Sequence, residues 1–215
     1  MIADDTELIG GPEKREIVIA EYDPSWPLRF RQHASAIAGA LQARALRIEH
    51  IGSTSVPGLA AKPIIDVLLV VDQPEREDTY VPALEGAGYV LRVREPSFDQ
   101  HRMLRSPGRD MHLHVFPPTS PEVGRYLILR DLLRSDPDAR QLYADTKRDL
   151  ALRDWPTMNH YADAKTKVIE HLLAQASEAS CSTCPHNLEL GDHREDVEQQ
   201  PGDYVGRGGG LHHPG

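Results

Sequence analysis

Residues 49–71 read EHIGSTSVPGLAAKPIIDVLLVV, and this stretch joins a turn of small residues to an almost wholly aliphatic run. Residues 52–58 are rich in Gly, Ser and Pro, which predicts a tight turn or loop. Residues 64–71 predict a buried β-strand, because a continuous run of Ile, Leu and Val suits a strand that is covered on both faces. Asp66 is the one carboxylate in that run. The stretch therefore predicts the edge of an α/β domain that carries the functional site.

The segments before this stretch predict where the domain begins. Residues 17–20 form a β-branched run that stops at the breaker pair of residues 23–24, so the fold is expected to start near Glu16. Apolar residues recur at helical spacing across residues 27–46, which predicts the first long helix. Residues 46–48 then turn strand-like.

The segments after it alternate between helix and strand signals. Residues 79–88 resemble a short helix closed by glycines, and residues 89–93 return to strand character. Residues 101–104 and 111–116 flank a segment with turn chemistry, which predicts a β-hairpin. Helix and strand follow one another, as in an α/β fold.

The second arm of this hairpin carries two histidines. Because side chains alternate along a strand, His112 and His114 share one face, while Met111, Leu113 and Val115 share the other. A strand of this kind could neighbour the one that carries Asp66.

The rest of the chain predicts a helical part and a tail. Residues 122–134, 137–153 and 159–176 read as three helices. We predict an α/β (α+β) fold, a mixed sheet flanked by helices with a helical C-terminal part. The expected division is a flexible segment at residues 1–15, one domain at 16–177 and a largely disordered tail at 178–215, where apolar residues are too few to offset the entropy of ordering.

Composition limits the classes of partner. The chain has 215 residues, 40% of them hydrophobic and 27% charged, as expected for one globular domain with a tail. A formal net charge of −9 makes nucleic acid a poor candidate partner, because binding to a phosphate backbone depends on a basic surface. A small phosphorylated ligand or nucleotide needs only a few well-placed donors.

The N-terminal residues predict no export or membrane contact. They lack the basic and apolar regions of a signal peptide, and no later run approaches about 18 apolar residues. We therefore expect a cytoplasmic protein. Cys181 and Cys184 both fall in the polar C-terminal segment, so the sequence implies no disulfide framework.

The turn and the strand together predict a site for phosphate and metal. Gly52 would let backbone N–H groups approach a phosphate, Ser53 and Thr54 would donate to its oxygens, and Asp66 would hold Mg²⁺. The alternative is a surface turn whose Ser and Thr cap a short helix, with Asp66 as a satisfied buried carboxylate.

A carboxylate on a buried strand needs a partner, since burying an unpaired charge is costly. Candidate partners for Asp66 are Lys62, His112 and His114. The histidines either bind a divalent ion together with Asp66, hydrogen-bond the carboxylate, or face solvent. Arg102 and Arg125 are candidates to clamp a polyphosphate, against the alternative of an ordinary solvated face.

Several motifs resemble the GrpB family. They are EHIGSTSVPGLAAKPIIDV at 49–67, EYDPSW at 21–26, HLHV at 112–115, RDLLR at 130–134 and YADAK at 161–165. The resemblance extends over about residues 16–176. It implies a nucleotidyltransferase-like fold that handles nucleotides, and in some bacteria a similar domain is fused behind dephospho-CoA kinase.

The resemblance also implies chemistry from which this sequence departs. Active members of the wider superfamily hold triphosphate on a Gly-Ser turn and two metal ions on two carboxylates one residue apart, with a third carboxylate on a later strand. Asp66 matches the first carboxylate, but Leu68 stands in the second position, and the later strand offers His112 and His114. A single Mg²⁺ on Asp66, with a histidine as general base, would remain workable.

We therefore predict a nucleotidyltransferase-like protein that binds a nucleotide such as ATP, or another phosphorylated ligand, and transfers a nucleotidyl group or acts through an adenylylated intermediate. In this prediction Lys62, Arg102 and Arg125 neutralise phosphate charge, and His112 or His114 handles a proton. Two alternatives stay open: a non-catalytic binding module that assists a partner enzyme, and a metal-binding hydrolase that uses Asp66 and the two histidines.

Overall fold

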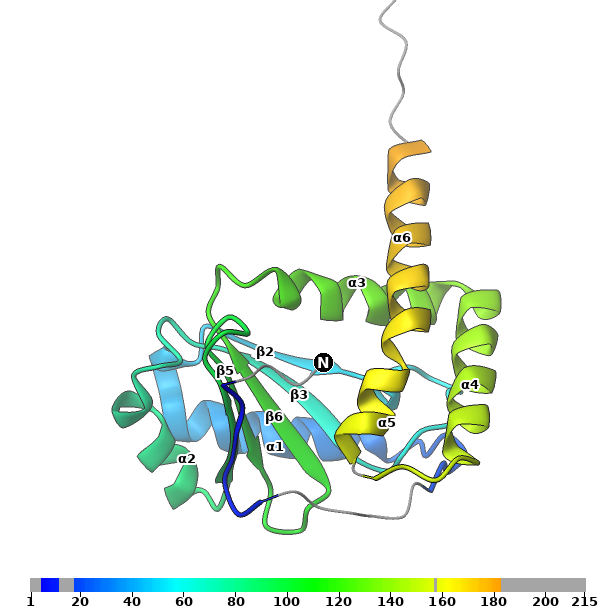
Figure 1. The fold of residues 1–215 in the computed structure, drawn as a ribbon. Coiled ribbons are helices and arrows are strands. Elements are labelled where there is room, and N and C mark those ends of the chain that lie inside the picture. The colour runs from blue at the N-terminus through cyan, green and yellow to red at the C-terminus, as the bar shows by residue number, and fades with distance from the viewer. Residues whose placement is uncertain (1–4, 12–17, 157, 183–215) are drawn as a thin grey trace, which may run out of the picture. The chain divides into compact units, whose positions relative to one another are not determined.

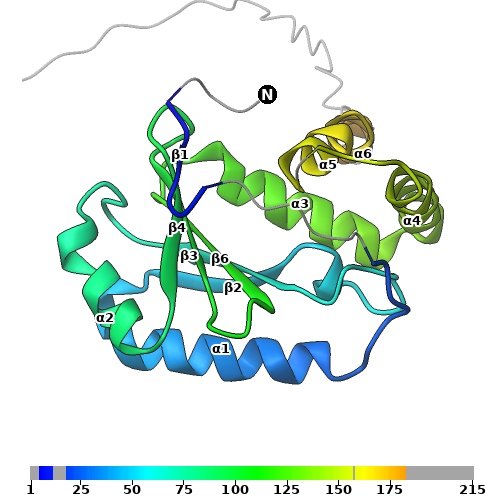
Figure 2. The same cartoon turned by 60° about the horizontal axis from the view of Figure 1, so that its bottom comes forward.

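Six β-strands form one mixed sheet in the computed structural model, in the order β1-β4-β5-β6-β3-β2 (Figure 1 and Figure 2). The structure describes residues 5–11, 18–156 and 158–182. The strands are β1 Glu7–Leu8, β2 Arg47–Ile51, β3 Ile65–Val70, β4 Val90–Glu95, β5 His101–Arg105 and β6 Met111–Phe116. The helices are α1 Trp26–Leu41, α2 Val81–Gly86, α3 Pro121–Ser135, α4 Pro137–Ala151, α5 Met158–Ala164 and α6 Thr166–Ser182, with 3-10 turns at η1 Gln42–Arg44, η2 Ser53–Ser55 and η3 Glu77–Thr79. The predicted mixed sheet with flanking helices and a helical C-terminal part is confirmed.

The strand pair β3 and β6 is parallel, and the other four strand pairings of the sheet are antiparallel. β3 is the aliphatic run of the quoted stretch. In its register with β6, Asp66 lies opposite His112 and Leu68 lies opposite His114. The hairpin and the strand are therefore neighbours, and both histidines lie beside the carboxylate.

One face of the sheet packs on α1 and α2. Val67 and Leu69 of β3 are fully buried there, together with Ile37 and Leu41 of α1. Alternation along the strand puts every second aliphatic residue on this face. The α1 helix has Pro27 in its first turn, where the missing N–H costs no helical hydrogen bond.

The opposite face packs on α3, so α1 and α3 lie on the two sides of the sheet (Figure 2). Leu68, Val70 and Phe116 form a small core on that face, covered by partly buried residues of α3. Asp66, at the start of β3, projects from this same face because it lies two residues before Leu68.

The C-terminal helices hold the segment that follows the η2 turn. Val56 and Leu59 from that segment are buried with Leu133 of α3, Tyr143 of α4 and Leu172 of α6. The α4 helix begins at a cap, where the Asp136 carboxylate accepts hydrogen bonds from two backbone N–H groups at 2.8 and 3.0 Å. The turn beside Asp66 is thus fixed by helices from the far end of the sequence.

Three details differ from the sequence-based expectations. The fold begins earlier than Glu16, because Glu7 and Leu8 pair with β4. The run at 17–20 contributes only one isolated bridge among its described residues, between Ala20 and Ala61. The helix predicted at 159–176 is two helices, α5 and α6, with a break at Lys165.

The tail prediction falls mostly beyond the part of the chain that the structure describes. The α6 helix runs through the start of the expected tail, and residues 183–215 lie outside the described residues. Within the described residues, the helices are too short or too polar to cross a membrane.

Candidate metal centre and phosphate turn

Asp66, His112 and His114 form a cluster on the α3 side of the sheet. One ligand atom from each lies within 4.8 Å of the other two. Oδ1 of Asp66 is 3.6 Å from Nδ1 of His112 and 3.7 Å from Nε2 of His114. The side chains of Asp66, His112 and His114 are 31%, 27% and 20% exposed, so a ligand can reach them from solvent.

These separations fit a shared cation better than direct hydrogen bonds. An N–H···O hydrogen bond has its heavy atoms about 2.7–3.2 Å apart. Two ligands of a tetrahedral ion lie about 3.4 Å apart when each bond is about 2.1 Å long. The residues present, one carboxylate and two imidazoles, are therefore a suitable donor set for a divalent metal ion.

The carboxylate of this cluster is ionised at neutral pH. Burial raises the pKa of Asp66, but the two imidazoles beside it outweigh that effect and lower the pKa below its ordinary value. A negative ligand with two neutral nitrogen ligands leaves a bound divalent ion with net positive charge, which favours an anionic substrate.

The Nδ1 atom of His114, on the side of the ring away from Asp66, is fixed by a chain of two further side chains, His101 and Glu95. Nε2 of His101 lies 3.1 Å from Nδ1 of His114, and Nδ1 of His101 lies 2.6 Å from Oε2 of Glu95. A carboxylate accepts only, so His101 donates to Glu95 through Nδ1–H and accepts from His114 at Nε2. His114 then carries its proton on Nδ1 and presents the lone pair of Nε2 toward Asp66. Metal-binding histidines are commonly fixed in this way.

The pKa shifts of His101 and Glu95 agree with these hydrogen-bond directions. Burial lowers the pKa of His101, so the ring is neutral near pH 7. A neutral imidazole accepts a hydrogen bond at one nitrogen and donates one from the other. The hydrogen bond from His101 lowers the pKa of Glu95, so this carboxyl is charged.

Gly52 brings the turn against Asp66. Its backbone has φ 67° and ψ −176°, a region that is essentially restricted to glycine. A Cβ on Gly52 would lie 3.0 Å from Cβ of Asp66 and closer still to Oδ2. The glycine is therefore required both by its backbone conformation and by the close approach of the carboxylate.

Ser53 and Thr54 face different neighbours. The side chain of Ser53 shares a hydrogen bond with the Tyr143 hydroxyl, whose pKa burial raises to about 12. Thr54 is 1% exposed, and its Oγ1 lies 3.1 Å from Nε2 of His50, which stacks on Phe30 of α1. Thr54 thus braces the turn from inside and does not offer its hydroxyl to a phosphate, contrary to the prediction.

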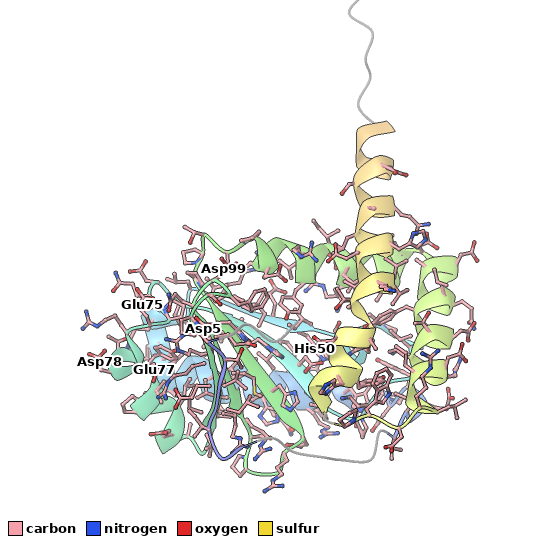
Figure 3. All side chains as sticks on the ribbon, in the orientation of Figure 1. Asp5, His50, Glu75, Glu77, Asp78 and Asp99 are labelled. Carbon is pink, nitrogen blue, oxygen red and sulfur yellow. The ribbon has the colours of Figure 1, made fainter. Side chains whose placement is uncertain are left out.

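Arginines of α3 complete the support of the turn. Arg134 donates from Nε and Nη2 to the Ser55 carbonyl at 3.0 and 2.8 Å. Arg130 donates to Oε2 of Glu49 at 2.9 Å. The turn is therefore fixed on one side by α3 and on the other by His50, which Figure 3 labels.

Arg102 and Arg125, both predicted to clamp phosphate, form ion pairs with glutamates. Arg102 is 5% exposed and points to the other face of β5 from His101, where its Nε donates to Oε1 of Glu77 at 2.7 Å. Glu77 lies on the α2 side of the molecule, away from His50 (Figure 3). Arg125 forms an ion pair of 2.5 Å with Glu170 that links α3 to α6.

Lys62, predicted to neutralise phosphate charge or to partner Asp66, contacts an aromatic ring. Its Nζ lies 5.0 Å from the centre of the Tyr161 ring, on α5, in a cation–π contact. It therefore joins the surroundings of the C-terminal helices.

Several residues of the site escaped the sequence analysis, chief among them His101, Glu95, Tyr143 and Lys147. A signal existed for His101, because it stands in the predicted hairpin whose other arm carries the two histidines. Tyr143 and Lys147 are four residues apart on one predicted helix and so share a face. The sequence gives no sign that this face meets the turn.

The sequence model of the family described as GrpB protein matches residues 16–175. This range includes Asp66, His112 and His114, which we call the metal-type cluster. A similar protein, described as a UPF0157 protein of Halalkalibacterium halodurans, is 47% identical over 166 residues, which cover 77% of this chain and 85% of the other. The crystal structure of conserved protein GrpB from Enterococcus faecalis has a TM-score of 0.65 at 33% identity, covering 76% of this chain and 99% of that one.

Two further similarities are weaker. The dephospho-CoA kinase of Mycolicibacterium paratuberculosis is 30% identical over 169 residues, which cover 66% of this chain and 42% of the kinase. The Cid1 poly(U) polymerase, crystallised with MgATP, has a TM-score of 0.39 at 10% identity, covering 60% of this chain and 45% of the polymerase. The first similarity is confined to less than half of the kinase, and the second is a distant likeness to a nucleotidyltransferase.

Proposed function

This chain belongs to the GrpB family, and we propose that it binds a divalent metal ion through Asp66, His112 and His114 and uses that ion to hold a nucleotide or another phosphorylated ligand. The observation that carries the proposal is the spacing of the three side chains, 3.6 and 3.7 Å from Oδ1 of Asp66 to the two imidazole nitrogens. The phosphate would lie beside Gly52 and Ser53.

The donor set favours a transition metal over the Mg²⁺ expected from the sequence. Mg²⁺ prefers oxygen ligands in octahedral geometry, whereas imidazole nitrogen suits Zn²⁺ or Fe²⁺, and Mn²⁺ accepts a mixed set of nitrogen and oxygen ligands. Two of the three side chains here offer nitrogen. Such an ion would act as a Lewis acid on a phosphate oxygen.

The residues around the cluster have definable tasks. Glu95 and His101 fix the neutral His114 ring with its proton on Nδ1, so Nε2 is available as a metal ligand, a role that replaces the general base suggested by the sequence. Gly52 leaves room for the Asp66 carboxylate to turn toward the metal. The reaction to test is the one that the family resemblance implies, transfer of a nucleotidyl group with release of pyrophosphate, with ATP as the first nucleotide.

A non-catalytic role is the second candidate, and one observation favours it. A dephospho-CoA kinase contains a segment that is 30% identical to this chain. The segment makes up 42% of the kinase, so the larger part of the kinase lies outside it. In this alternative the same site binds a phosphorylated ligand for a partner enzyme and forms no product.

A thermal-shift screen with product analysis tests the proposal. The full chain is heated with ATP, other nucleotides or CoA precursors, each with Mn²⁺, Zn²⁺, Mg²⁺ or EDTA, because a ligand that binds the folded state raises the melting temperature. We expect a rise with a nucleotide that needs Mn²⁺ or Zn²⁺ and is lost in Asp66→Asn.

Asp72→Asn is the matched control, since Asp72 is an exposed carboxylate just beyond β3. It should behave as the wild type. The proposal is refuted if no ligand raises the melting temperature in a metal-dependent way. A metal-dependent rise without any product would favour the non-catalytic binding module.

A further inference from the structure

Three lysines gather beside the turn, around two tyrosines of the C-terminal helices. Nζ of Lys62 and Nζ of Lys165 each lie 5.0 Å from the centre of the Tyr161 ring. Nζ of Lys147 lies 4.9 Å from the centre of the Tyr143 ring. The lysines come from the segment before β3, from α4 and from the break between α5 and α6, so the fold itself assembles them.

Lys147 is the most confined of the three. It is 2% exposed, and its Nζ donates to the Ala60 carbonyl at 2.5 Å. The charged groups that act on it are Lys165 and Arg148, both cationic, and together with burial they lower the pKa of Lys147 to about 7. A buried ammonium group among like charges is unfavourable unless it loses its proton or an anion joins it.

The lysine group is connected to the metal-type cluster through the turn. Tyr143 shares a hydrogen bond with Ser53, and the charge of Asp66 contributes to raising the pKa of the Tyr143 hydroxyl. Tyr143 and Lys147 lie on consecutive turns of α4, and α4 lies beside α5 (Figure 1). Lys147 and Tyr143 are themselves buried, whereas Lys62 and Lys165 are partly exposed, so a ligand would reach the group from the side of Lys62 and Lys165.

A purely structural role explains only part of this arrangement. Lys147 clamps the segment after η2 through the Ala60 carbonyl, and one lysine suffices for that. Lys62 and Lys165 both contact the Tyr161 ring, so three ammonium groups lie around two tyrosines in a chain whose formal net charge is −9. Such a local concentration of positive charge attracts an anionic ligand.

We propose that Lys62, Lys147 and Lys165 form a binding subsite for the phosphate chain of the ligand, next to the Ser53 turn and separate from the metal-type cluster. The proposal rests on the proposed function in one respect, namely that the same ligand reaches Asp66. It names the substrate class: a compound with two or more linked phosphates, such as a nucleoside polyphosphate or pyrophosphate. Ammonium groups bind such chains as point charges.

Calorimetric titration of inorganic pyrophosphate into the full chain, with EDTA present, tests the subsite alone. We expect binding to the wild type that weakens as salt is added, and about tenfold weaker binding in both Lys62→Gln and Lys165→Gln, because each removes one charge-assisted contact. Lys167→Gln is the matched control, an exposed lysine two residues after Lys165, and should bind as the wild type. Lys147→Gln is left out of the decisive set because loss of the Ala60 contact also affects folding.

The result that overturns the proposal is absence of pyrophosphate binding to the wild type, or unchanged binding in either Lys62→Gln or Lys165→Gln. A parallel titration of ATP distinguishes a nucleotide from free pyrophosphate as the better ligand. Asp66→Asn should keep its affinity for pyrophosphate in EDTA. Failure of the subsite therefore stays distinct from failure of metal binding, which is measured without any phosphate.

Discussion

Gly52 shows how one residue determines the geometry of the site. Its φ of 67° with ψ of −176° lies in a region that other residues avoid, and its missing side chain leaves the space that the Asp66 carboxylate occupies. A β-carbon would strain the turn and displace the carboxylate. Backbone and ligand geometry therefore depend on the same glycine.

Gly52→Ala should separate these two effects when it is compared with Gly58→Ala. Both glycines have positive φ, but a Cβ on Gly58 meets nothing within 4 Å. We expect each variant to lose about 1–3 kcal/mol of unfolding free energy in urea titrations. Only Gly52→Ala should also weaken metal binding, measured by calorimetry. Equal metal affinity in the two variants would show that Gly52 does not position Asp66.

His101→Phe tests the support of His114. Phenylalanine keeps a ring that can stack on Phe116, as His101 does at 4.5 Å, but it cannot bond to His114 or Glu95. We expect metal affinity to fall about 10- to 100-fold, since His114 loses the partner that fixes its tautomer. His33→Phe, on α1, removes a histidine that bonds to Tyr89 and should leave metal affinity unchanged. A wild-type affinity in His101→Phe would contradict the assigned orientation of His114.

His50 should make stability depend on pH. Burial lowers its pKa to about 4 from 6.5, with Arg134 and Arg130 adding to the shift and Asp66 opposing it. The unfolded chain therefore takes up a proton at higher pH than the folded chain does. Stability from this residue is present above pH 6.5 and is lost as the pH falls toward 4, by up to about 3 kcal/mol.

Denaturant titrations between pH 4 and pH 7 measure this effect. His50→Gln can still bond to Thr54 but does not titrate, so its stability should fall less over that range than the wild-type stability does. The exposed residue His171 on α6 provides the control, and His171→Gln should keep the wild-type slope. A slope that is unchanged in His50→Gln would contradict the account of His50.

At the scale of single residues, the sequence predicted the centre of the site better than its surroundings. Strand alternation placed His112 and His114 on one face, and the aliphatic run isolated Asp66, so their meeting needed only one correct strand pairing. The same alternation would have shown that Arg102 faces away from His101. The roles of Lys147 and Tyr143 depend on how α4 packs against the turn, which no local pattern encodes.

At the scale of elements, α3 connects the sheet to the turn. It covers the apolar part of the face that carries Asp66, and its Arg134 donates twice to the Ser55 carbonyl. The helix is anchored at its start by the Ser120 side chain, which accepts from the N–H of Glu122 at 3.2 Å. The position of the turn therefore depends on the position of α3.

Arg134→Ala should destabilise the protein through this contact. Ser55 is 5% exposed, and its carbonyl would lose two charged donors, at a cost of about 1–3 kcal/mol. Arg125→Ala removes an arginine of the same helix whose ion pair with Glu170 is exposed, so its cost should stay within about 1 kcal/mol. Urea denaturation compares the two, and an equal effect would mean that the turn does not depend on α3.

The order and type of most elements could be predicted, because their hydrophobic periods are clear and glycine or proline separates them. The β1 strand could not, since Glu7 and Leu8 become a strand only by pairing with Arg94 and Val93 far along the chain. The break between α5 and α6 also had no local signal, and nothing in the structure explains why it falls at Lys165.

At the scale of the whole molecule, the fold places Asp66 with its two histidines against Gly52, and Tyr143, which Lys147 contacts, beside Ser53. This arrangement suits a ligand with phosphate groups, although the overall charge of the chain is negative. Local placement of charge decides which ligands fit, and net charge mainly excludes a long nucleic-acid contact.

Metal titration of the full chain tests the central claim most directly. Calorimetry with Mn²⁺ or Zn²⁺, on protein stripped of metal, should give a site that is lost or weakened at least about tenfold in Asp66→Asn, His112→Gln and His114→Gln, but kept in Asp72→Asn. Comparison with these variants is needed because Cys184, His186 and other residues beyond 182 can also bind such ions. Our account predicts one ion per chain that depends on all three side chains, and it is contradicted if the three variants bind metal as the wild type does.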